Sequence, residues 1–366
     1  MTILVLNAGS SSLKFHLFDD EQLLLKGMVE RISAESNATE AALDLVFERI
    51  GDRKIDAVGH RVVHGGDLFP QSTIIDQAVE KGIEELCDLA PLHNPHSLAC
   101  YRLARARLPG VTHVAVFDTA FHHTLPPHAY HYALPLEYLA SMKIRRYGFH
   151  GISHRYVSAH FARLQKTPLA ALKLITCHLG NGCSMCAVDG GESVDVSMGL
   201  TPLEGLVMGT RSGDIDPGAV LHLILHEGKT PEEVFHLLNY QSGLLGLSGD
   251  SNDMRDLIER ARKVDPRASL AIDVFCYRAK KYIGAYLAAM NGADAIIFTA
   301  GIGENAPEIR AQICEGLDSF GIAIDAEANA RQDQGARQVG FSKIPVWVIP
   351  ANEELLIARD TAALAR

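Results

Sequence analysis

Apolar and polar residues alternate in short blocks near the start of each half of the chain. Residues 3–6 are apolar, residues 7–12 have the small and polar residues of a turn, and residues 13–18 return to a β-type pattern. The same order of strand, polar turn and strand recurs from residue 174 to residue 188. Two such units indicate a duplicated design with two domains.

Predicted helices and strands alternate in the second half of the chain. A long amphipathic helix is expected at residues 266–290, and Thr230 with Glu233 forms a capping box at the start of another helix. Strands are expected at residues 295–299 and 345–349, each followed by a polar turn and a helix. This is an α/β pattern, and ligands in open α/β sheets bind at the carboxyl ends of the strands.

The composition is that of an ordinary globular protein. The chain has 366 residues, of which 47% are hydrophobic, and this length suggests two domains. A net charge of −10 disfavours nucleic acid and membrane surfaces as partners. Seven scattered cysteines favour a reducing compartment. No apolar run is long enough to span a bilayer, and the first residues lack the pattern of a signal peptide. The sequence therefore predicts a cytoplasmic protein.

Three turns combine glycine with polar residues in a way that suits phosphate binding. Residues 7–14 end in Lys14 but do not form a G-x-x-x-x-G-K-[ST] loop, and a plain hairpin turn explains them equally well. Residues 178–182 form a second such turn, and residues 300–305 form a third at a helix start. The third also fits a dinucleotide fingerprint, although too few residues follow Asp325 to complete a dehydrogenase domain.

Charged side chains stand at predicted strand ends and among glycines. Arg61 runs into a Gly-Gly turn and Arg211 lies between two glycines, and arginine binds carboxylate and phosphate through paired hydrogen bonds. Asp118 ends a predicted strand, and His150 lies in a glycine-flanked turn. Each residue alone is better explained as a surface residue or a structural ion pair. Together with the phosphate-type turns, they favour Mg²⁺-assisted phosphoryl transfer.

Two short motifs have the spacing of metal sites but lack further ligands. Cys183 and Cys186 form a C-x-x-C pattern without a second pair, so they are interpreted as small apolar strand residues. His150 and His154 stand four residues apart without the glutamate of an H-E-x-x-H motif. The sequence therefore predicts no zinc site.

The motifs taken together resemble those of the acetokinase family, within the superfamily of sugar kinases, chaperone ATPases and actin. The matching segments follow the family order over nearly the whole chain, at residues 6–14, 60–66, 90–95, 117–122, 146–151, 178–182, 202–205, 209–213, 251–256, 298–305 and 352–355. The resemblance implies an α/β fold of two actin-like (ribonuclease H-like) domains flanking a nucleotide cleft. The first domain is expected to comprise residues 1–120 and 354–366, and the second, with most of the nucleotide site, residues 121–353.

The resemblance also implies an activity. The expected reaction is the reversible, Mg²⁺-dependent, in-line transfer of a phosphoryl group from ATP to acetate, giving ADP and acetyl phosphate. Mn²⁺ is expected to substitute for Mg²⁺. The chain is expected to form a homodimer. A propionate or other short-chain acyl kinase of the same family is the alternative. A sugar kinase would lack the pair Arg61 and Arg211, and an ATP-driven binding protein would need a peptide-binding domain for which no residues remain.

Residue roles follow from the family motifs by position. The implied catalytic residues are Asp118, His150, Arg211 and Arg61, and the implied metal ligands are Asn7 and Glu353. The implied substrate-binding residues are Arg61, Val63, Leu92, His93, Phe149 and Pro202. The implied nucleotide-binding residues are Lys14, Ser10, Ser12, His178, Leu179, Gly180, Asn181, Gly182, Asp253, Met254, Arg255, Gly301, Ile302, Gly303, Glu304 and Asn305. Val63 enters this set because strand alternation puts it on the side of Arg61, where it would limit the length of the acid.

The chain departs from the family pattern in three places. The segment between Glu21 and Gly59 is shorter than usual, so part of the periphery of the first domain is expected to be missing. Met254 replaces an aromatic residue and Cys183 replaces a serine. No motif falls inside the shortened segment, so the chemistry is expected to be intact.

Overall fold

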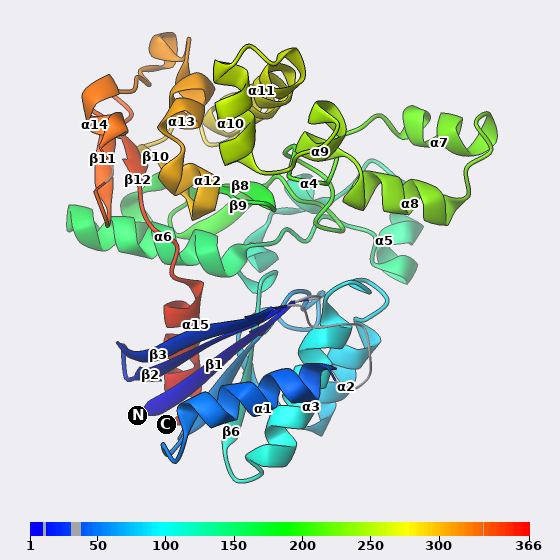
Figure 1. The fold of residues 1–366 in the computed structure, drawn as a ribbon, viewed down its shortest axis with the longest axis vertical. Helices are drawn as coiled ribbons and strands as arrows, with labels where there is room; N and C mark the ends of the chain where they lie inside the picture. The colour runs from blue at the N-terminus through cyan, green and yellow to red at the C-terminus, as the bar shows by residue number, and fades with distance from the viewer. Residues whose placement is uncertain (10–11, 31–37, 332) are drawn as a thin grey trace. The chain divides into compact units, whose positions relative to one another are not determined.

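The computed structural model describes residues 1–9, 12–30, 38–331 and 333–366, which form two compact units (Figure 1). The first unit comprises Met1–His123, Phe149–Tyr156 and Asn352–Arg366. The second comprises Thr124–Gly148 and Val157–Ala351. The chain therefore returns to the first unit at its C-terminus.

A six-stranded sheet with the strand order β3-β2-β1-β4-β6-β5 forms the centre of the first unit. β1, β2 and β3 are antiparallel neighbours, β1, β4 and β6 run parallel, and β5 pairs antiparallel with β6. The strands are β1 (Thr2–Ala8), β2 (Ser12–Asp19), β3 (Gln22–Glu30), β4 (Ala57–Val62), β5 (Thr73–Ile74) and β6 (Thr112–Phe117). The helices of this unit are α1 (Ala38–Ile50), α2 (Gln77–Glu85), α3 (Asn94–Arg107) and α15 (Glu353–Ala365).

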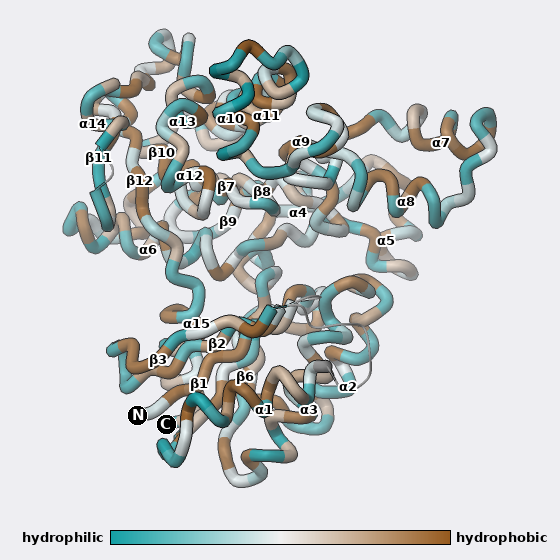
Figure 2. The backbone as a smooth tube through the Cα atoms, in the orientation of Figure 1, coloured by the Kyte–Doolittle hydropathy of each residue, from teal (hydrophilic) through white to brown (hydrophobic). Residues whose placement is uncertain are grey.

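Alternating side chains of β1 enter two separate cores of the first unit. Leu4 and Leu6 belong to a cluster with residues of α1 and α3, whereas Ile3 and Val5 belong to a cluster with residues of α15. The tube of β1 is coloured mostly as hydrophobic in Figure 2. Because successive side chains of a strand point to opposite faces, helices cover both faces of this sheet. The near-continuous apolar run of β1 follows from this double burial.

The sheet of the second unit has the strand order β11-β12-β10-β7-β8-β9. β7, β8 and β9 are antiparallel neighbours, β7, β10 and β12 run parallel, and β11 pairs antiparallel with β12. The strands are β7 (Lys173–Leu179), β8 (Cys183–Asp189), β9 (Glu192–Val196), β10 (Ala295–Thr299), β11 (Arg337–Gly340) and β12 (Val346–Val348). In both sheets, the innermost of three antiparallel strands runs parallel to the next two strands, and an antiparallel strand forms the far edge, which confirms the duplicated α/β design.

The second unit contains more helices than the first. They are α4 (Pro127–Tyr130), α5 (Leu136–Met142), α7 (Pro217–Leu225), α8 (Pro231–Tyr240), α9 (Gly243–Ser248), α10 (Met254–Arg262), α11 (Pro266–Ala289), α12 (Ala300–Asn305), α13 (Pro307–Cys314) and α14 (Ala326–Ala330), and α6 (Gly151–Gln165) begins in the first unit and continues into the second. The predicted capping box of Thr230 and Glu233 is present at the start of α8. The predicted long helix is α11. Among the described helices, none is both long and apolar enough to cross a membrane.

Helix α15 lies directly against the backbone of β4. A Cβ atom added at Gly59 would stand 2.4 Å from Thr361 Oγ1 and 2.7 Å from Ile357 Cγ2. Real Cβ atoms do not approach other atoms this closely, so the helix can reach the strand only where a side chain is absent. The absence of a side chain at Gly59 thus allows the C-terminal helix to cover this face of the sheet.

We expect Gly59→Ala to destabilise the protein, because the added methyl group forces α15 away from β4. Overpacking of a filled core costs about 1–3 kcal/mol of unfolding free energy. Thermal and urea denaturation measure the loss. Gly284→Ala is the matched control, since its Cβ meets no described atom within 4 Å and alanine favours a helix. Equal stability of Gly59→Ala and the wild type would contradict the close packing.

Candidate active site

The carboxyl ends of the three parallel strands of the first unit carry a connected set of polar side chains. Arg61 near the end of β4 donates from Nε to Asp118 Oδ1 (3.1 Å) and from Nη2 to Asp118 Oδ2 (2.5 Å). Its Nη1 donates to Asn7 Oδ1 on β1 (3.1 Å). β4 lies between β1 and β6, so the sheet brings together Asn7, Arg61 and Asp118 from three distant stretches of sequence.

Burial and neighbouring charges shift the ionisation of this set. Burial alone would lower the pKa of Arg61, but the carboxylates of Asp118 and Glu353 raise it above its ordinary value. Burial raises the pKa of Glu353, at the start of α15, to about 7, although the charge of Arg61 acts in the opposite direction. Asp118 is only 1% exposed, and its bidentate bond to Arg61 compensates for its burial. The site therefore holds one fixed cation among oxygen-bearing groups.

Lys14 lies on the same face of the sheet as Asn7. The two residues are directly opposite each other in the antiparallel pair of β1 and β2, and side chains at opposite positions share a face. Lys14 is exposed, and Ser12 at the start of β2 is half-buried. Ser10, the other predicted hydroxyl of this turn, lies outside the described residues.

The predicted substrate-binding residues of the first unit lie in neighbouring segments. Asn94 accepts the backbone N–H of His64 (3.0 Å) and donates to its carbonyl (2.9 Å), which ties Leu92 and His93 to the segment after β4. The ring of Phe149 packs edge-on against the ring of His64, with centroids 5.4 Å apart. Because β4 ends at Val62, strand alternation does not extend to Val63, and the pocket role of Val63 stays a prediction.

In the second unit, the loop that carries Arg211 is held by bonds within itself and by a bond to α11. Arg211 Nη1 donates to the carbonyl of Pro202 (3.0 Å), and the backbone N–H of Met208 donates to the carbonyl of Arg211 (3.1 Å). Asp214 accepts from the backbone N–H of Gly205 (2.8 Å) and from Arg278 (2.8 Å). Burial lowers the pKa of Arg211. These bonds hold a partly buried guanidinium in a fixed loop.

The predicted nucleotide-binding segments of the second unit meet one another. Residues 178–182 span the turn between β7 and β8, and residues 301–305 lie in α12, which follows β10, the strand beside β7. The carbonyl of Asn181 accepts the backbone N–H of Gly209 (2.9 Å), which joins this turn to the loop of Arg211. The side chain of Asn181 accepts from Asn252 (3.2 Å), next to Asp253. The residues are thus gathered at the carboxyl end of the sheet.

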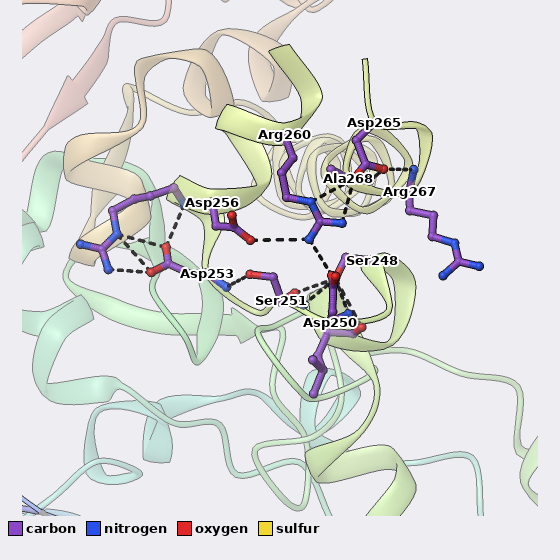
Figure 3. Close-up of polar contacts among 11 residues, drawn as sticks. Ser248, Asp250, Ser251, Asp253, Asp256, Arg260, Asp265, Arg267 and Ala268 are labelled. Carbon is purple, nitrogen blue, oxygen red and sulfur yellow. Dashed lines mark hydrogen bonds and ion pairs between the residues drawn. The ribbon is translucent and has the colours of Figure 1, made fainter. Parts of the chain in front are cut away.

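Asp253, labelled in Figure 3, is the N-cap of α10 and is bonded to Arg255. Its Oδ1 accepts the backbone N–H of Arg255 (2.9 Å), and its Oδ2 accepts from Arg255 Nη2 (2.6 Å). Further along α10, Arg260 bonds Asp250 (2.5 Å) and Asp265 (2.8 Å), the latter at the N-terminus of α11. Met254 is buried, so its side chain contributes to packing.

The short motifs that resembled metal sites form no metal site in the described part of the chain. All seven cysteines are free thiols, and Cys183 Sγ donates to the carbonyl of Gly180 (3.0 Å). His154 is buried in α6, whereas His150 precedes that helix. No three His, Cys, Asp or Glu residues among those described are arranged to hold a metal ion.

Comparison with known proteins identifies the family. Residues 2–45 and 35–359 match the model of the acetokinase family. The chain belongs to the acetokinase family. The two matches overlap at residues 35–45, within the segment that the sequence predicted to be shortened.

Named acetokinase relatives are similar over the whole chain. The acetate kinase of Halothermothrix orenii is 50% identical over 395 residues, which cover 100% of this chain and 99% of that protein. The crystal structure of Porphyromonas gingivalis acetate kinase has a TM-score of 0.93 at 39% identity, with 100% of both chains covered. A propionate kinase from Francisella tularensis has a TM-score of 0.93 at 40% identity, with 99% of both chains covered.

Membership of the acetokinase family also resolves the dinucleotide alternative. Asp325, which could have contacted a ribose in a dehydrogenase, instead caps α14 by accepting the backbone N–H of Ala328 (2.7 Å). Sequence reasoning assigned no role to Asn94 or Asp214. Asn94 lies inside the family segment at residues 90–95, and Asp214 directly follows the segment at residues 209–213. This proximity to family motifs is the sequence signal that could have indicated both residues.

Two buried histidines, His60 on β4 and His113 on β6, form a hydrogen-bonded pair in the sheet of the first unit. His60 Nε2 donates to His113 Nδ1 (2.9 Å), because His113 Nε2 faces the carbonyl of Leu108 (3.5 Å) and must carry a proton. Burial lowers the pKa of His60 well below its ordinary value of 6.5, and it also lowers the pKa of His113. Both rings are therefore neutral in the folded state near neutral pH.

We expect His113→Gln to weaken the loss of stability on acidification. The wild type keeps both rings neutral while the unfolded chain takes up protons below about pH 6.5, so its unfolding free energy falls as the pH drops. Glutamine can accept from His60 but cannot titrate. Urea denaturation from about pH 7.5 to about pH 5 measures both slopes. His226→Gln, at an exposed position, is the control, and identical slopes for His113→Gln and wild type would refute the assignment.

Proposed function

We propose that this chain transfers a phosphoryl group reversibly from ATP to acetate, giving ADP and acetyl phosphate. The observation that carries the proposal is the set of Asn7, Arg61 and Asp118 at the carboxyl ends of three parallel strands. Membership of the acetokinase family and the names of its relatives support the same reaction. Direct in-line transfer needs charge neutralisation and positioning rather than a protein nucleophile.

Arg61 can bind the carboxylate substrate while it remains fixed by its neighbours. Three of its five N–H groups bond to Asp118 and Asn7, and the other two have no partner among the described residues. A planar guanidinium held in this way presents a preorganised donor to a carboxylate or a phosphoryl oxygen. Asp118 and His150 are proposed as the catalytic acid and as a donor to the transferring group.

The first unit also has groups suited to Mg²⁺. Asn7 supplies an amide oxygen and Glu353 a carboxylate, and oxygen atoms are the ligands that Mg²⁺ prefers. The pKa of Glu353 is raised to about 7, so a bound cation would favour its ionised form. We propose that these two residues hold the ion, which would neutralise charge on the phosphates; Mn²⁺ as a substitute stays a prediction.

The nucleotide is proposed to bind through the turns of the second unit. Backbone N–H groups at residues 178–182 and 301–305 provide donors for phosphate oxygens. Asp253 and Arg255 provide charged groups on the neighbouring α10. Arg211 is proposed to stabilise charge on the transferring phosphoryl group, because its loop keeps it partly buried.

Propionate is the second candidate substrate. The Francisella tularensis relative is a propionate kinase and is as similar in structure as the acetate kinase of Porphyromonas gingivalis. A single methylene group changes transition-state binding in an apolar pocket by only about 1–3 kcal/mol. We therefore propose acetate as the preferred acid, with a modest margin over propionate.

We further propose that the protein is a cytoplasmic homodimer. Helices α7 and α8 expose large apolar side chains, among them Leu221 (54% exposed), Leu225 (70%) and Phe235 (46%). Exposed apolar residues on neighbouring helices suit burial against a second copy of the chain. Sedimentation equilibrium measures the mass, and a purely monomeric protein would contradict the proposed dimer.

We expect Arg61→Ala and Arg211→Ala each to lower kcat/KM for acetate by about 10²–10³-fold, because each removes a preorganised donor to developing charge. Lysine at either position should restore little activity, since it cannot reproduce the planar fork. A hydroxamate assay for the acyl phosphate measures turnover. Arg262→Ala, an exposed arginine of α10, is the control. Near-normal turnover in either variant would remove that arginine from the mechanism.

We expect Val63→Ala to raise kcat/KM for propionate relative to acetate, because a smaller side chain leaves room for the longer acid. Val62→Ala is the matched control. Because Val62 belongs to a hydrophobic core, this substitution should lower only the melting temperature. Both acids are compared in the hydroxamate assay alongside thermal denaturation. An unchanged ratio of the two acids would show that Val63 serves packing alone.

A further inference from the structure

The turn that contains His150 is fixed on both sides of that residue. On the C-terminal side, the backbone N–H of Gly151 donates to the carbonyl of Asp118 (2.9 Å). A Cβ atom at position 151 would lie 2.2 Å from that carbonyl oxygen, so the two backbones are in direct contact. On the N-terminal side, the carbonyl of Phe149 accepts from the side chain of His122 (3.0 Å).

His150 itself has an uncommon backbone conformation. Its φ is +56°, in the left-handed region that residues other than glycine seldom adopt. Such conformations persist where the surroundings fix them, and they are concentrated at functional sites. The two flanking bonds provide this restraint, one from the backbone of Asp118 and one from the imidazole of His122.

The imidazole of His122 is a buried, neutral donor to the Phe149 carbonyl. The side chain is 1% exposed, and burial lowers its pKa to about 4, although the bond to Phe149 acts in the opposite direction. A carbonyl can only accept, so Nε2 carries the proton of a neutral ring. His122 lies in the short 3₁₀ helix Ala120–Thr124 directly after Asp118, and its ring packs against His154 of α6 at 5.8 Å.

We propose that His122 is a positioning residue for catalysis. Its Nε2–H bond to the Phe149 carbonyl holds the turn in the conformation that presents His150. The same short stretch of chain, from Asp118 to His122, thereby fixes two proposed catalytic groups relative to each other. This inference rests on the proposed role of His150, and it adds a residue that acts through His150 without contacting the substrate.

The alternative is that His122 only fills space in the core. Its ring also packs against Phe121, with centroids 5.6 Å apart, so the loss of any buried ring here could destabilise the fold. His122→Phe keeps an aromatic ring of similar size and removes the donor. His122→Gln keeps a donor, because the amide nitrogen of glutamine can reach the position of Nε2. Comparing the two variants therefore separates the hydrogen bond from packing.

The hydroxamate assay measures kcat and the KM for ATP of the whole chain. Thermal denaturation measures the melting temperature of each variant. We expect His122→Phe to lower kcat by about 10–100-fold, because small displacements of a catalytic group can cost this much. The KM for ATP should be unchanged, and His122→Gln should recover most of the lost kcat. His123→Phe, which makes the same change at the exposed neighbouring position, should behave as the wild type.

A double-mutant cycle with His150→Ala tests whether the loss of kcat in His122→Phe arises through His150. If His122 acts through His150, His122→Phe should cause no further loss of kcat in the His150→Ala background. Fully additive losses, or equal kcat in His122→Phe and wild type, would overturn the inference. Normal turnover of His150→Ala alone would instead refute the proposed catalytic role of His150, so the two failures are distinguishable.

Discussion

The bidentate bond between Arg61 and Asp118 is the interaction on which the rest of the first unit's site depends. It joins the end of β4 to the residue after β6, and the third bond of Arg61 adds Asn7 of β1. Taking an ion pair out of water is costly, and close geometry with further hydrogen bonds offsets that cost. The removal of either partner would leave an uncompensated buried charge. The pair is therefore both a structural link between strands and the source of the site's charge.

Further segments attach to this link through the backbone. The carbonyl of Asp118 accepts from Gly151, which starts α6, and Thr119 Oγ1 accepts from the N–H of Gly65 in the turn after β4. Buried backbone groups need partners, so these bonds fix the turns at little additional cost. Two of the candidate substrate-binding residues, Val63 and Phe149, lie on these turns, and their positions depend on the same strand ends.

Buried histidines of the first unit act as neutral hydrogen-bonding groups. Burial lowers the pKa of His60, His113 and His122, and each ring bonds a carbonyl or another ring. A neutral imidazole offers one donor and one acceptor in a fixed direction, which suits a bond that must set backbone conformation. The abundance of histidine in the sequence is thus partly explained by structure, and among the described residues no group of three His, Cys, Asp or Glu side chains is arranged around a metal position.

The sequence by itself determined the α/β class, the duplicated strand units and the family, because these depend on local hydrophobic periodicity, turn residues and the order of motifs. It also identified Arg61, Asp118 and Arg211 as a group, since glycine turns and strand ends are local features. It did not assign a role to His122 or Asn94, whose partners lie 27 and 30 residues away along the chain. Nor did it reveal that His150 has a positive φ or that α15 lies against Gly59. Only the tertiary structure decided these features, because they depend on contacts between residues distant in the sequence, and one-dimensional patterns contain no record of which strand ends meet.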